Sequence, residues 1–116
     1  NDTFSHQIGD DVLRIVGQIL ESGCRGVDFA ARYGGEEFAL VFSQTDLTGA
    51  LIACERARQR IEHHNWSDLH PQLKVTVSIG VGCDPTLPNH EKLLAAADEQ
   101  LYRAKRAGRN RVFPQG

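Results

Sequence analysis

The chain has 116 residues, which fits one compact domain, residues 1–116, with a single hydrophobic core. Apolar residues make up 41% of the sequence and charged residues 24%, as in ordinary soluble proteins, and no apolar run approaches the roughly 20 residues that span a bilayer. The formal net charge of −2 excludes general attraction to nucleic acid, although basic residues near the C-terminus leave a local anion site open. We expect a soluble cytoplasmic domain that makes no membrane contact itself.

The cysteines and histidines show no metal-binding pattern. The three cysteines, Cys24, Cys54 and Cys83, are far apart in the sequence and odd in number, without a C-x-x-C pair. This pattern favours reduced thiols in a cytoplasm over a disulfide framework or a zinc site. The five histidines show no H-E-x-x-H or similar spacing.

The first predicted element is a helix, because apolar residues recur at helical spacing from Asp10 to Leu20 and Gly23 is a suitable stop. Two strands should follow, joined by Gly34-Gly35 as a hairpin. The second strand, residues 38–42, is almost wholly apolar, as a strand covered on both faces would be. In the first strand, apolar and polar positions alternate, the apolar ones being Val27, Phe29, Ala31 and Tyr33.

Asp46 can cap a second helix with an apolar stripe that runs from Leu47 to Ile61. Residues 73–82 alternate strictly between apolar and polar or small side chains, which predicts a strand. A third helix should begin near Asn89 and end near Gly108. The charged residues of the second helix expected mainly outside its apolar stripe are Arg56, Arg58, Arg60 and Glu62.

A short last strand is expected at residues 111–113. The resulting order is helix, hairpin, helix, strand, helix, strand. This order favours an α/β or α+β fold in which helices flank a mixed β-sheet.

The hairpin carries an unusual pair of carboxylates. Glycine at positions 34 and 35 frees φ to be positive, as the tightest two-residue hairpins require, and lets a bulky ligand approach the backbone; alone, the pair indicates only a hairpin. Glu36 and Glu37 follow, although glutamate is depleted in strands and rarely buried unpaired. Something cationic should lie nearby, and the pair suits a hard ion such as Mg²⁺ that keeps phosphate oxygens and water among its ligands. Because successive strand side chains point to opposite faces, the two carboxylates should have different roles rather than chelate one ion symmetrically.

The sequence of residues 31–38, A-R-Y-G-G-E-E-F, resembles the signature of the GGDEF family, the diguanylate cyclases, in its GGEEF form. Three more segments occur in the family's order: N-D-T-F-S-H-Q-I-G-D at 1–10, T-V-S-I-G-V at 76–81 and A-D-E-Q-L-Y-R-A-K-R-A-G-R-N-R-V at 97–112. The resemblance covers essentially the whole chain. It implies the family's fold, which is similar to nucleotidyl cyclases and to the polymerase palm.

Family members condense two GTP molecules into cyclic di-GMP and pyrophosphate, with one GTP in each of two domains that face each other as a homodimer. The ribose 3′-hydroxyl of one GTP attacks the α-phosphate of the other. This reaction needs alignment and neutralised phosphate charge rather than a protein nucleophile. The resemblance therefore implies a GTP substrate, Mg²⁺ or Mn²⁺ as cofactor, and an upstream sensor domain, with a membrane anchor there left open.

The resemblance also assigns the active-site residues. It makes Glu36 a metal ligand, with help in deprotonating the 3′-hydroxyl as a further expectation, and Glu37 a second metal-site residue; these two are the expected catalytic residues. Gly34 and Gly35 would let the nucleotide lie against the backbone.

Two further pairs match substrate-binding positions of the family. Asn1 and Asp10 match the guanine-reading positions, and an amide with a carboxylate suits the acceptor and donor edges of guanine; Asp10 could instead, or also, be a helix N-cap. Lys105 and Arg109 match the phosphate contacts and, being four residues apart near a helix end, should project to one side. Read alone, that pair would be a solvated basic terminus at the negative end of the helix dipole.

An inhibitory product site is implied upstream of the hairpin. Arg25 and Asp28 fit the family's R-x-x-D motif in register with Gly34, and Arg56 matches an additional arginine. An arginine fork and a carboxylate can clamp a guanylate, although this spacing is often only a surface ion pair.

The strand that precedes position 1 in the family, with its metal-binding aspartate and a lysine, is missing from the sequence. In the family that strand lies inside the sheet, so we expect its loss to leave a strand-width gap with unpaired backbone groups. We also expect the natural protein to continue upstream, and the 116-residue chain alone to be weakly active or inactive.

Two other functions stay open. One is a catalytically silent receptor that binds cyclic di-GMP through Arg25, Asp28 and Arg56. The other is a cyclase of the related palm-type fold that uses a different nucleotide, which the combination of Asn1 and Asp10 disfavours.

Overall fold

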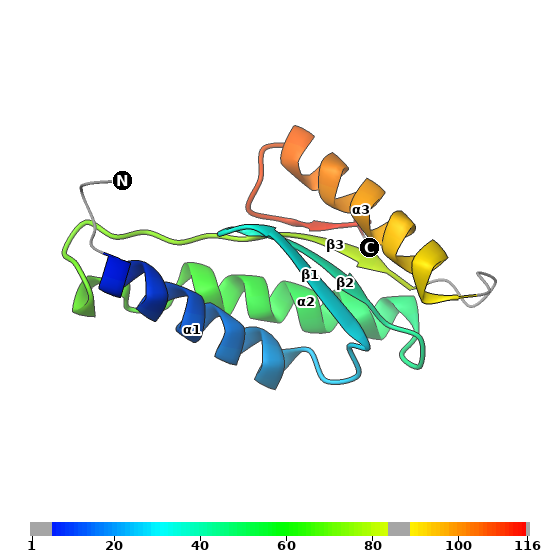
Figure 1. Ribbon diagram of the computed structural model, residues 1–116, viewed down its shortest axis with the longest axis horizontal. Helices are drawn as coiled ribbons and strands as arrows, with labels where there is room; N and C mark the ends of the chain where they lie inside the picture. The colour runs from blue at the N-terminus through cyan, green and yellow to red at the C-terminus, as the bar shows by residue number, and fades with distance from the viewer. Residues whose placement is uncertain (1–5, 84–88, 116) are drawn as a thin grey trace.

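The structure is a computed structural model that describes residues 6–83 and 89–115 (Figure 1). The helices and strands follow the order expected from the sequence. In chain order they are α1 (His6–Gly23), β1 (Phe29–Gly34), β2 (Glu37–Val41), α2 (Leu47–Glu62), the short 3₁₀ helix Trp66–Asp68, β3 (Ser78–Gly82), α3 (His90–Arg106) and β4 (Val112–Phe113).

The four strands form one mixed sheet in the order β1-β2-β3-β4. β1 and β2 are the antiparallel arms of the hairpin, whereas β2 pairs with β3, and β3 with β4, in parallel. Each parallel pair is joined through a helix, α2 or α3, as parallel strands require. The expected mixed sheet with flanking helices is confirmed.

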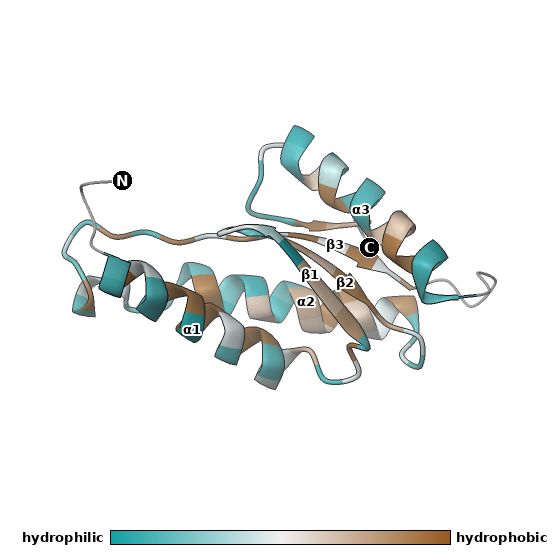
Figure 2. Ribbon diagram, viewed as in Figure 1, coloured by the Kyte–Doolittle hydropathy of each residue, from teal (hydrophilic) through white to brown (hydrophobic). Residues whose placement is uncertain are grey.

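Helices cover both faces of the sheet (Figure 1). α1 and α2 lie side by side on one face, and α3 crosses the other face over β2 and β3. Figure 2 shows that the sides of the helices facing the sheet are the hydrophobic ones. The larger core lies between the sheet and the α1–α2 layer and includes Val16, Leu40, Phe42, Ile61 and Ile79, each nearly or fully buried. A membrane-spanning helix is absent from the described part of the chain, where no helix combines the needed length and hydropathy.

α3 approaches β3 so closely that glycine is required on the strand. A Cβ atom on Gly80 would lie 2.2 Å from the carbonyl oxygen of Ala97, and one on Gly82 would lie 2.2 Å from that of Leu93. Ala97 and Leu93 are themselves buried. The small residues that alternate in the predicted strand therefore mark the face on which α3 lies.

The expected gap in the sheet is absent from the described residues, so that prediction is wrong. β2 pairs directly with β3, with Glu37 opposite Ser78 and Leu40 opposite Val81. The two strands are direct neighbours and exchange the hydrogen bonds of a parallel ladder, so no space for a further strand lies between them. The amide of Phe42 extends this pairing by donating to the carbonyl of Gly82 over 2.9 Å.

The length of one strand and the exposure of one side chain differ from the prediction. β3 is shorter than the alternation over residues 73–82 suggested, because β2 begins at Glu37 and offers no partner before Ser78. Residues Val75 and Val77 in the unpaired part are nevertheless buried in the core. On α2, Arg58 was expected outside, yet only 13% of its side chain is exposed because it is enclosed by partners.

The alternating pattern of β1 does not mark a buried face. β1 is an edge strand of the sheet, and its apolar residues Phe29 and Tyr33 are 47% and 54% exposed. The register also shifts between Arg32 and Gly34, which places Tyr33 as an extra residue in a bulge.

Cys24 and Cys54 meet in the larger core. Their Sγ atoms are 4.0 Å apart, and none of Cys24, Cys54 and Cys83 forms a disulfide. The hydrogen bond between the two lowers the pKa of Cys24 and, with burial, raises that of Cys54.

Candidate active site

The turn of the hairpin differs from the predicted one. Gly34 belongs to β1 and pairs with Glu37, so Gly35 and Glu36 form the connection. Among the described glycines, only Gly26 and Gly108 have positive φ, so the expectation for positions 34 and 35 is wrong.

The backbone at this turn is open, as a nucleotide site would require. A Cβ atom built on Gly35 would have no other atom within 4 Å. Glu36 is exposed, and its Oε1 accepts a hydrogen bond from Thr76 Oγ1 over 3.3 Å. A cavity of about 280 Å³ lies here, lined by Gly35, Glu36, Glu37, Ser78 and Arg109.

Glu37 lies between two cations, as the sequence led us to expect. Its Oε1 is 3.1 Å from Lys105 Nζ, and its Oε2 accepts a hydrogen bond from Arg109 Nη1 over 3.2 Å. The Lys105 ammonium, followed by the Arg109 guanidinium, lowers the pKa of Glu37 below its ordinary value. Glu37 is therefore a carboxylate at neutral pH.

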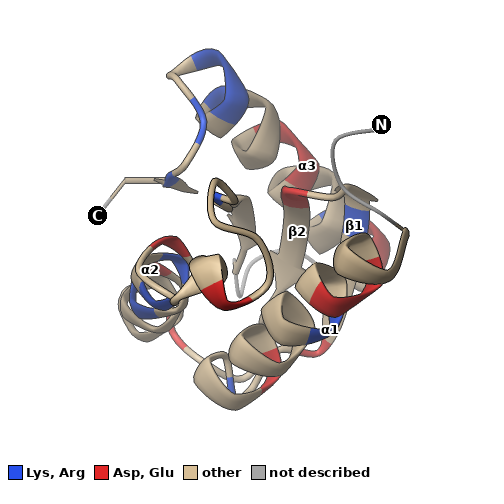
Figure 3. Cartoon of the chain, turned by 90° about the vertical axis from the view of Figure 1, so that its left-hand side faces the viewer, with Lys and Arg blue, Asp and Glu red and all other residues tan. Residues whose placement is uncertain are grey.

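Lys105 and Arg109 reach Glu37 from different kinds of backbone. Lys105 belongs to the last turn of α3, where basic residues gather (Figure 3). The helix ends at Arg106, and Arg109 lies beyond it with a left-handed φ of 65°. The two were expected to project together because they were four apart on one helix; the structure brings them together through the loop that follows Gly108 instead.

Ser78 is a residue of this cavity that the sequence reasoning did not assign. It is 2% exposed, and its Oγ accepts a hydrogen bond from the amide of Asn110 over 3.1 Å. A signal was present, since Ser78 is one of the two polar residues, with Thr76, of the T-V-S-I-G-V segment. The hydroxyl connects β3 to the loop that carries Arg109.

The donor set fits a metal ion that shares its coordination with a substrate. In residues 6–83 and 89–115, no group of three or more His, Cys, Asp or Glu side chains could form an all-protein cage. Mg²⁺ commonly takes one or two carboxylates and fills its other positions with phosphate oxygens and water. Glu36, which accepts a side-chain hydrogen bond from Thr76, and Glu37 meet that description, with Glu37 also engaged by its two cations.

The two guanine-reading candidates have different outcomes. Asn1 lies outside the described residues. Asp10 is exposed within α1, which begins at His6, so the alternative of an N-cap at Asp10 is wrong. Four preceding helical residues place Asp10 after the first turn, where its own amide has a helical partner available.

The three residues of the expected inhibitory site come from separate parts of the chain. Arg25 lies between α1 and β1, Asp28 immediately before β1, and Arg56 on α2. Both arginines are exposed, and within the described part of the chain no hydrogen bond or ion pair joins the three side chains. Asp28 Oδ2 accepts a hydrogen bond from the backbone amide of Ser43 over 2.6 Å. The Ser43 side chain, followed by this amide, lowers the pKa of Asp28.

Comparison with known families gives a match over nearly the whole chain. The family described as "Diguanylate cyclase, GGDEF domain" matches residues 1–111. The chain belongs to the GGDEF family. The four segments that resemble the family's motifs, at 1–10, 31–38, 76–81 and 97–112, fall almost wholly within this match.

Curated GGDEF proteins align along 97% of this chain. They include the response regulator PleD of Caulobacter vibrioides at 41% identity, diguanylate cyclase A of Treponema denticola at 40% and diguanylate cyclase DosC of Escherichia coli at 39%. The chain spans only 25%, 30% and 25% of their respective lengths.

A solved GGDEF structure supports the fold directly. The crystal structure of the GGDEF domain of DgcB from Caulobacter crescentus, in complex with c-di-GMP, superposes with a TM-score of 0.74 at 34% identity. The superposition covers 97% of this chain and 67% of that one. The palm-like α/β arrangement expected from the sequence is therefore confirmed.

Proposed function

We propose that this GGDEF chain is the catalytic domain of a diguanylate cyclase, which condenses two GTP molecules into cyclic di-GMP and pyrophosphate. The observation that carries the proposal is the position of Glu37, held by Lys105 and Arg109 beside the open turn at Gly35. Two carboxylates, Glu36 and Glu37, and the cation Arg109 line one cavity, and Lys105 contacts Glu37 beside it. Phosphoryl transfer requires such charge complementarity more than it requires a protein nucleophile.

Lys105 and Arg109 are the proposed phosphate ligands. In this structure both are paired with Glu37, whose single negative charge offsets one of their two positive charges. A triphosphate that enters the cavity would compete for the same donors, and Arg109, with 60% of its side chain exposed, is free to turn toward it. The Glu37 carboxylate would then be released from one or both ion pairs.

Glu36 and Glu37 are the residues that would hold a divalent cation, Mg²⁺ or Mn²⁺. When bound, such an ion neutralises phosphate charge and lowers the pKa of a hydroxyl bound to it. Glu36, which is exposed at the turn, is the proposed acceptor of the proton from a ribose 3′-hydroxyl. Asn1 and Asp10 are the proposed readers of the guanine base.

The reaction joins two nucleotides, so two copies of the domain would face each other with one GTP each. Arg25, Asp28 and Arg56 would bind the cyclic product and inhibit the enzyme. The relatives are longer than this chain, which supports further regions in the full-length protein. The proposed arrangement has a signal-receiving region upstream and the GGDEF domain in the cytoplasm. The alternative of a silent receptor would leave the cluster around Glu37 without a role.

The test is conversion of GTP by the full-length protein that contains this chain. With Mg²⁺, we expect chromatography to detect cyclic di-GMP and pyrophosphate in a 1:2 ratio. Glu36→Ala should abolish the reaction while leaving the circular dichroism spectrum unchanged. Normal turnover by that variant would refute the proposed metal site, and binding of cyclic di-GMP without any turnover by the wild type would favour the receptor.

A further inference from the structure

Two consecutive residues after α3, Arg109 and Asn110, adopt left-handed backbone conformations. Their φ angles are 65° and 49°, and they are the only described residues other than glycine with positive φ. Asparagine tolerates this region, whereas arginine does so at a cost of about 1 kcal/mol or more. Such a conformation persists only where the surroundings hold it, so the loop needs a restraint.

The restraint is a hydrogen-bonded group on α2. Arg58 Nη1 donates to Asn110 Oδ1 over 2.9 Å and to Glu62 Oε1 over 2.9 Å, and Asn110 Nδ2 donates to Glu62 Oε2 over 3.1 Å. The three side chains therefore close a ring. Both polar atoms of the Asn110 side chain are used, so the amide is fixed in one orientation.

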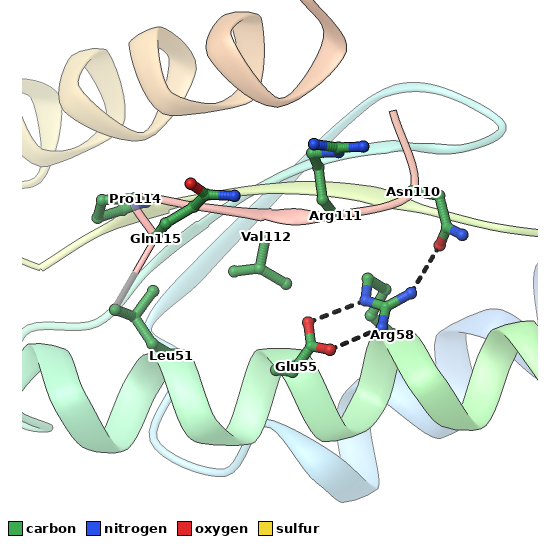
Figure 4. A pocket seen from close by; sticks show the side chains of 8 residues that line it. All are labelled: Leu51, Glu55, Arg58, Asn110, Arg111, Val112, Pro114 and Gln115. Atoms are coloured by element: carbon green, nitrogen blue, oxygen red, sulfur yellow. Dashed lines mark hydrogen bonds and ion pairs between the residues drawn. The ribbon is translucent and has the colours of Figure 1, made fainter. Parts of the chain in front are cut away.

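Arg58 is itself held firmly. Its Nε and Nη2 atoms form a two-pronged pair with Glu55, at 2.9 and 2.6 Å, which leaves Nη1 aimed at the loop (Figure 4). Only 13% of its side chain is exposed, beside a cavity of about 380 Å³ between α2 and the β4 segment. A lysine could not make both contacts, because it lacks the planar fork.

This group differs from an ordinary surface ion pair. Pairs such as Arg103 with Glu99 join neighbouring turns of one helix and leave both side chains more than half exposed. Arg58 and Asn110 are 52 residues apart in the chain. The backbone amide of Asn110 also donates a hydrogen bond to the hydroxyl of the buried Ser78. The contact therefore connects α2 and β3 to the loop that carries Arg109.

We propose that Arg58 and Asn110 are positioning residues that hold Arg109 in the left-handed conformation from which its guanidinium reaches Glu37. Neither residue need touch substrate. The structural part of this inference stands on the hydrogen bonds alone, and its catalytic consequence rests on the proposed function.

The test uses the full-length protein with Arg58→Gln, Asn110→Gly and Arg109→Ala, singly and with each of the first two combined with the third. Glycine is chosen at position 110 because it accepts positive φ without strain and removes only the side chain. Arg60→Gln is the matched control, since Arg60 lies on the same helix and contacts Ser22 instead. Circular dichroism confirms that each variant is folded, and Arg58→Lys provides a second, milder change.

Two readouts separate the inference from the proposed function. Amide hydrogen exchange at position 110 should be about tenfold faster in Arg58→Gln and Arg58→Lys, and unchanged in Arg60→Gln. GTP turnover should fall about tenfold in Arg58→Gln or Asn110→Gly, with no further fall when either is added to Arg109→Ala.

The outcomes are distinguishable. Unchanged exchange in Arg58→Gln, or turnover losses that multiply with that of Arg109→Ala, would overturn the positioning role. If the wild type converts no GTP, the proposed function fails, and the exchange measurement still decides whether Arg58 and Asn110 hold the loop.

Discussion

Glu37 and Arg109 are 72 positions apart in the chain, yet Arg109 Nη1 donates a hydrogen bond to Glu37 Oε2 over 3.2 Å. Glu37 begins β2, and Arg109 follows the end of α3, so their contact depends on the close seating of α3 on the sheet. Lys105 completes the arrangement at 3.1 Å. A substitution of Glu37, or one that moves α3 away from the sheet, should therefore disturb the contacts of Glu37 with Lys105 and Arg109.

Removing the charge of Glu37 should impair catalysis without unfolding the protein. Glu37→Gln keeps the shape of the side chain but loses both ion pairs, so we expect GTP turnover to fall by about 10²-fold or more. The matched control is Glu99→Gln, which removes an exposed carboxylate paired with Arg103 on α3. Steady-state cyclic di-GMP formation measures both, and an equal effect of the two substitutions would contradict the role of Glu37.

The close packing of α3 on β3 should not tolerate a methyl group added at Gly80. Gly80→Ala would place a Cβ atom 2.2 Å from backbone atoms of both Ala97 and Leu101, so we expect it to destabilise the fold by about 2 kcal/mol or more. Gly17→Ala is the control, because a Cβ atom there meets nothing within 4 Å and alanine favours the interior of α1, by about 0.5–1 kcal/mol. Urea unfolding should move the two midpoints in opposite directions.

If Gly80→Ala leaves the unfolding midpoint unchanged, α3 must lie farther from β3 than described. Loss of stability in Gly17→Ala would instead indicate that this face of α1 is covered in the full-length protein.

The stability supplied by Glu37 should depend on pH in the acid range. Its folded-state pKa is lowered by Lys105 and Arg109, so the stabilisation is complete above the unfolded pKa of about 4.3 and is lost as the pH falls through the lower folded value. The partners are partly exposed, which limits the effect to within about 1 kcal/mol. The measurement is the difference in unfolding free energy between wild type and Glu37→Gln from pH 7 to pH 2. We expect this difference to be constant at first and then to shrink. An increase in the difference on acidification would contradict the ion pairs.

Product inhibition should depend on Arg25. Arg25→Ala removes a two-pronged donor for a guanylate, so we expect affinity for cyclic di-GMP to fall by at least about tenfold, while turnover at low product is retained. Arg14→Ala, a change at an exposed arginine of α1 paired only weakly with Asp11 at 3.5 Å, should leave affinity unchanged. Calorimetry measures both, and unchanged binding by Arg25→Ala would show that the inhibitory site is misassigned.

Local patterns in the sequence predicted the helices well. Asp46 caps α2 with its Oδ1 on the amide of Gly49, and Asn89 caps α3 through the amide of Lys92, because such side chains satisfy the free amides of a first turn. The buried face of α3, Leu93, Ala97, Leu101 and Ala104, also follows directly from helical spacing.

Long-range relationships were not predictable in the same way. The pairing of β2 with β3 depends on which parallel strands meet, and no local pattern in β1 reveals that it lies at the sheet edge. Arginine on the polar side of a helix is typical of a surface position, so the sequence of α2 predicted that Arg58 is exposed. The contact with Asn110, from a distant part of the chain, helps to enclose it. Of the candidate site residues, Glu36, Glu37, Lys105 and Arg109 were proposed from family motifs, whereas the cavity residue Ser78 and the loop residue Asn110 were identified only in the structure.

The central claim is that the cavity at the hairpin binds a metal-bound guanosine triphosphate. The most direct measurement is a crystal structure of the protein with Mg²⁺ and a non-hydrolysable GTP analogue. We predict triphosphate oxygens on Lys105 and Arg109, with the cation on Glu36 or Glu37. A nucleotide bound elsewhere, with this cavity empty at saturating ligand, would contradict the claim.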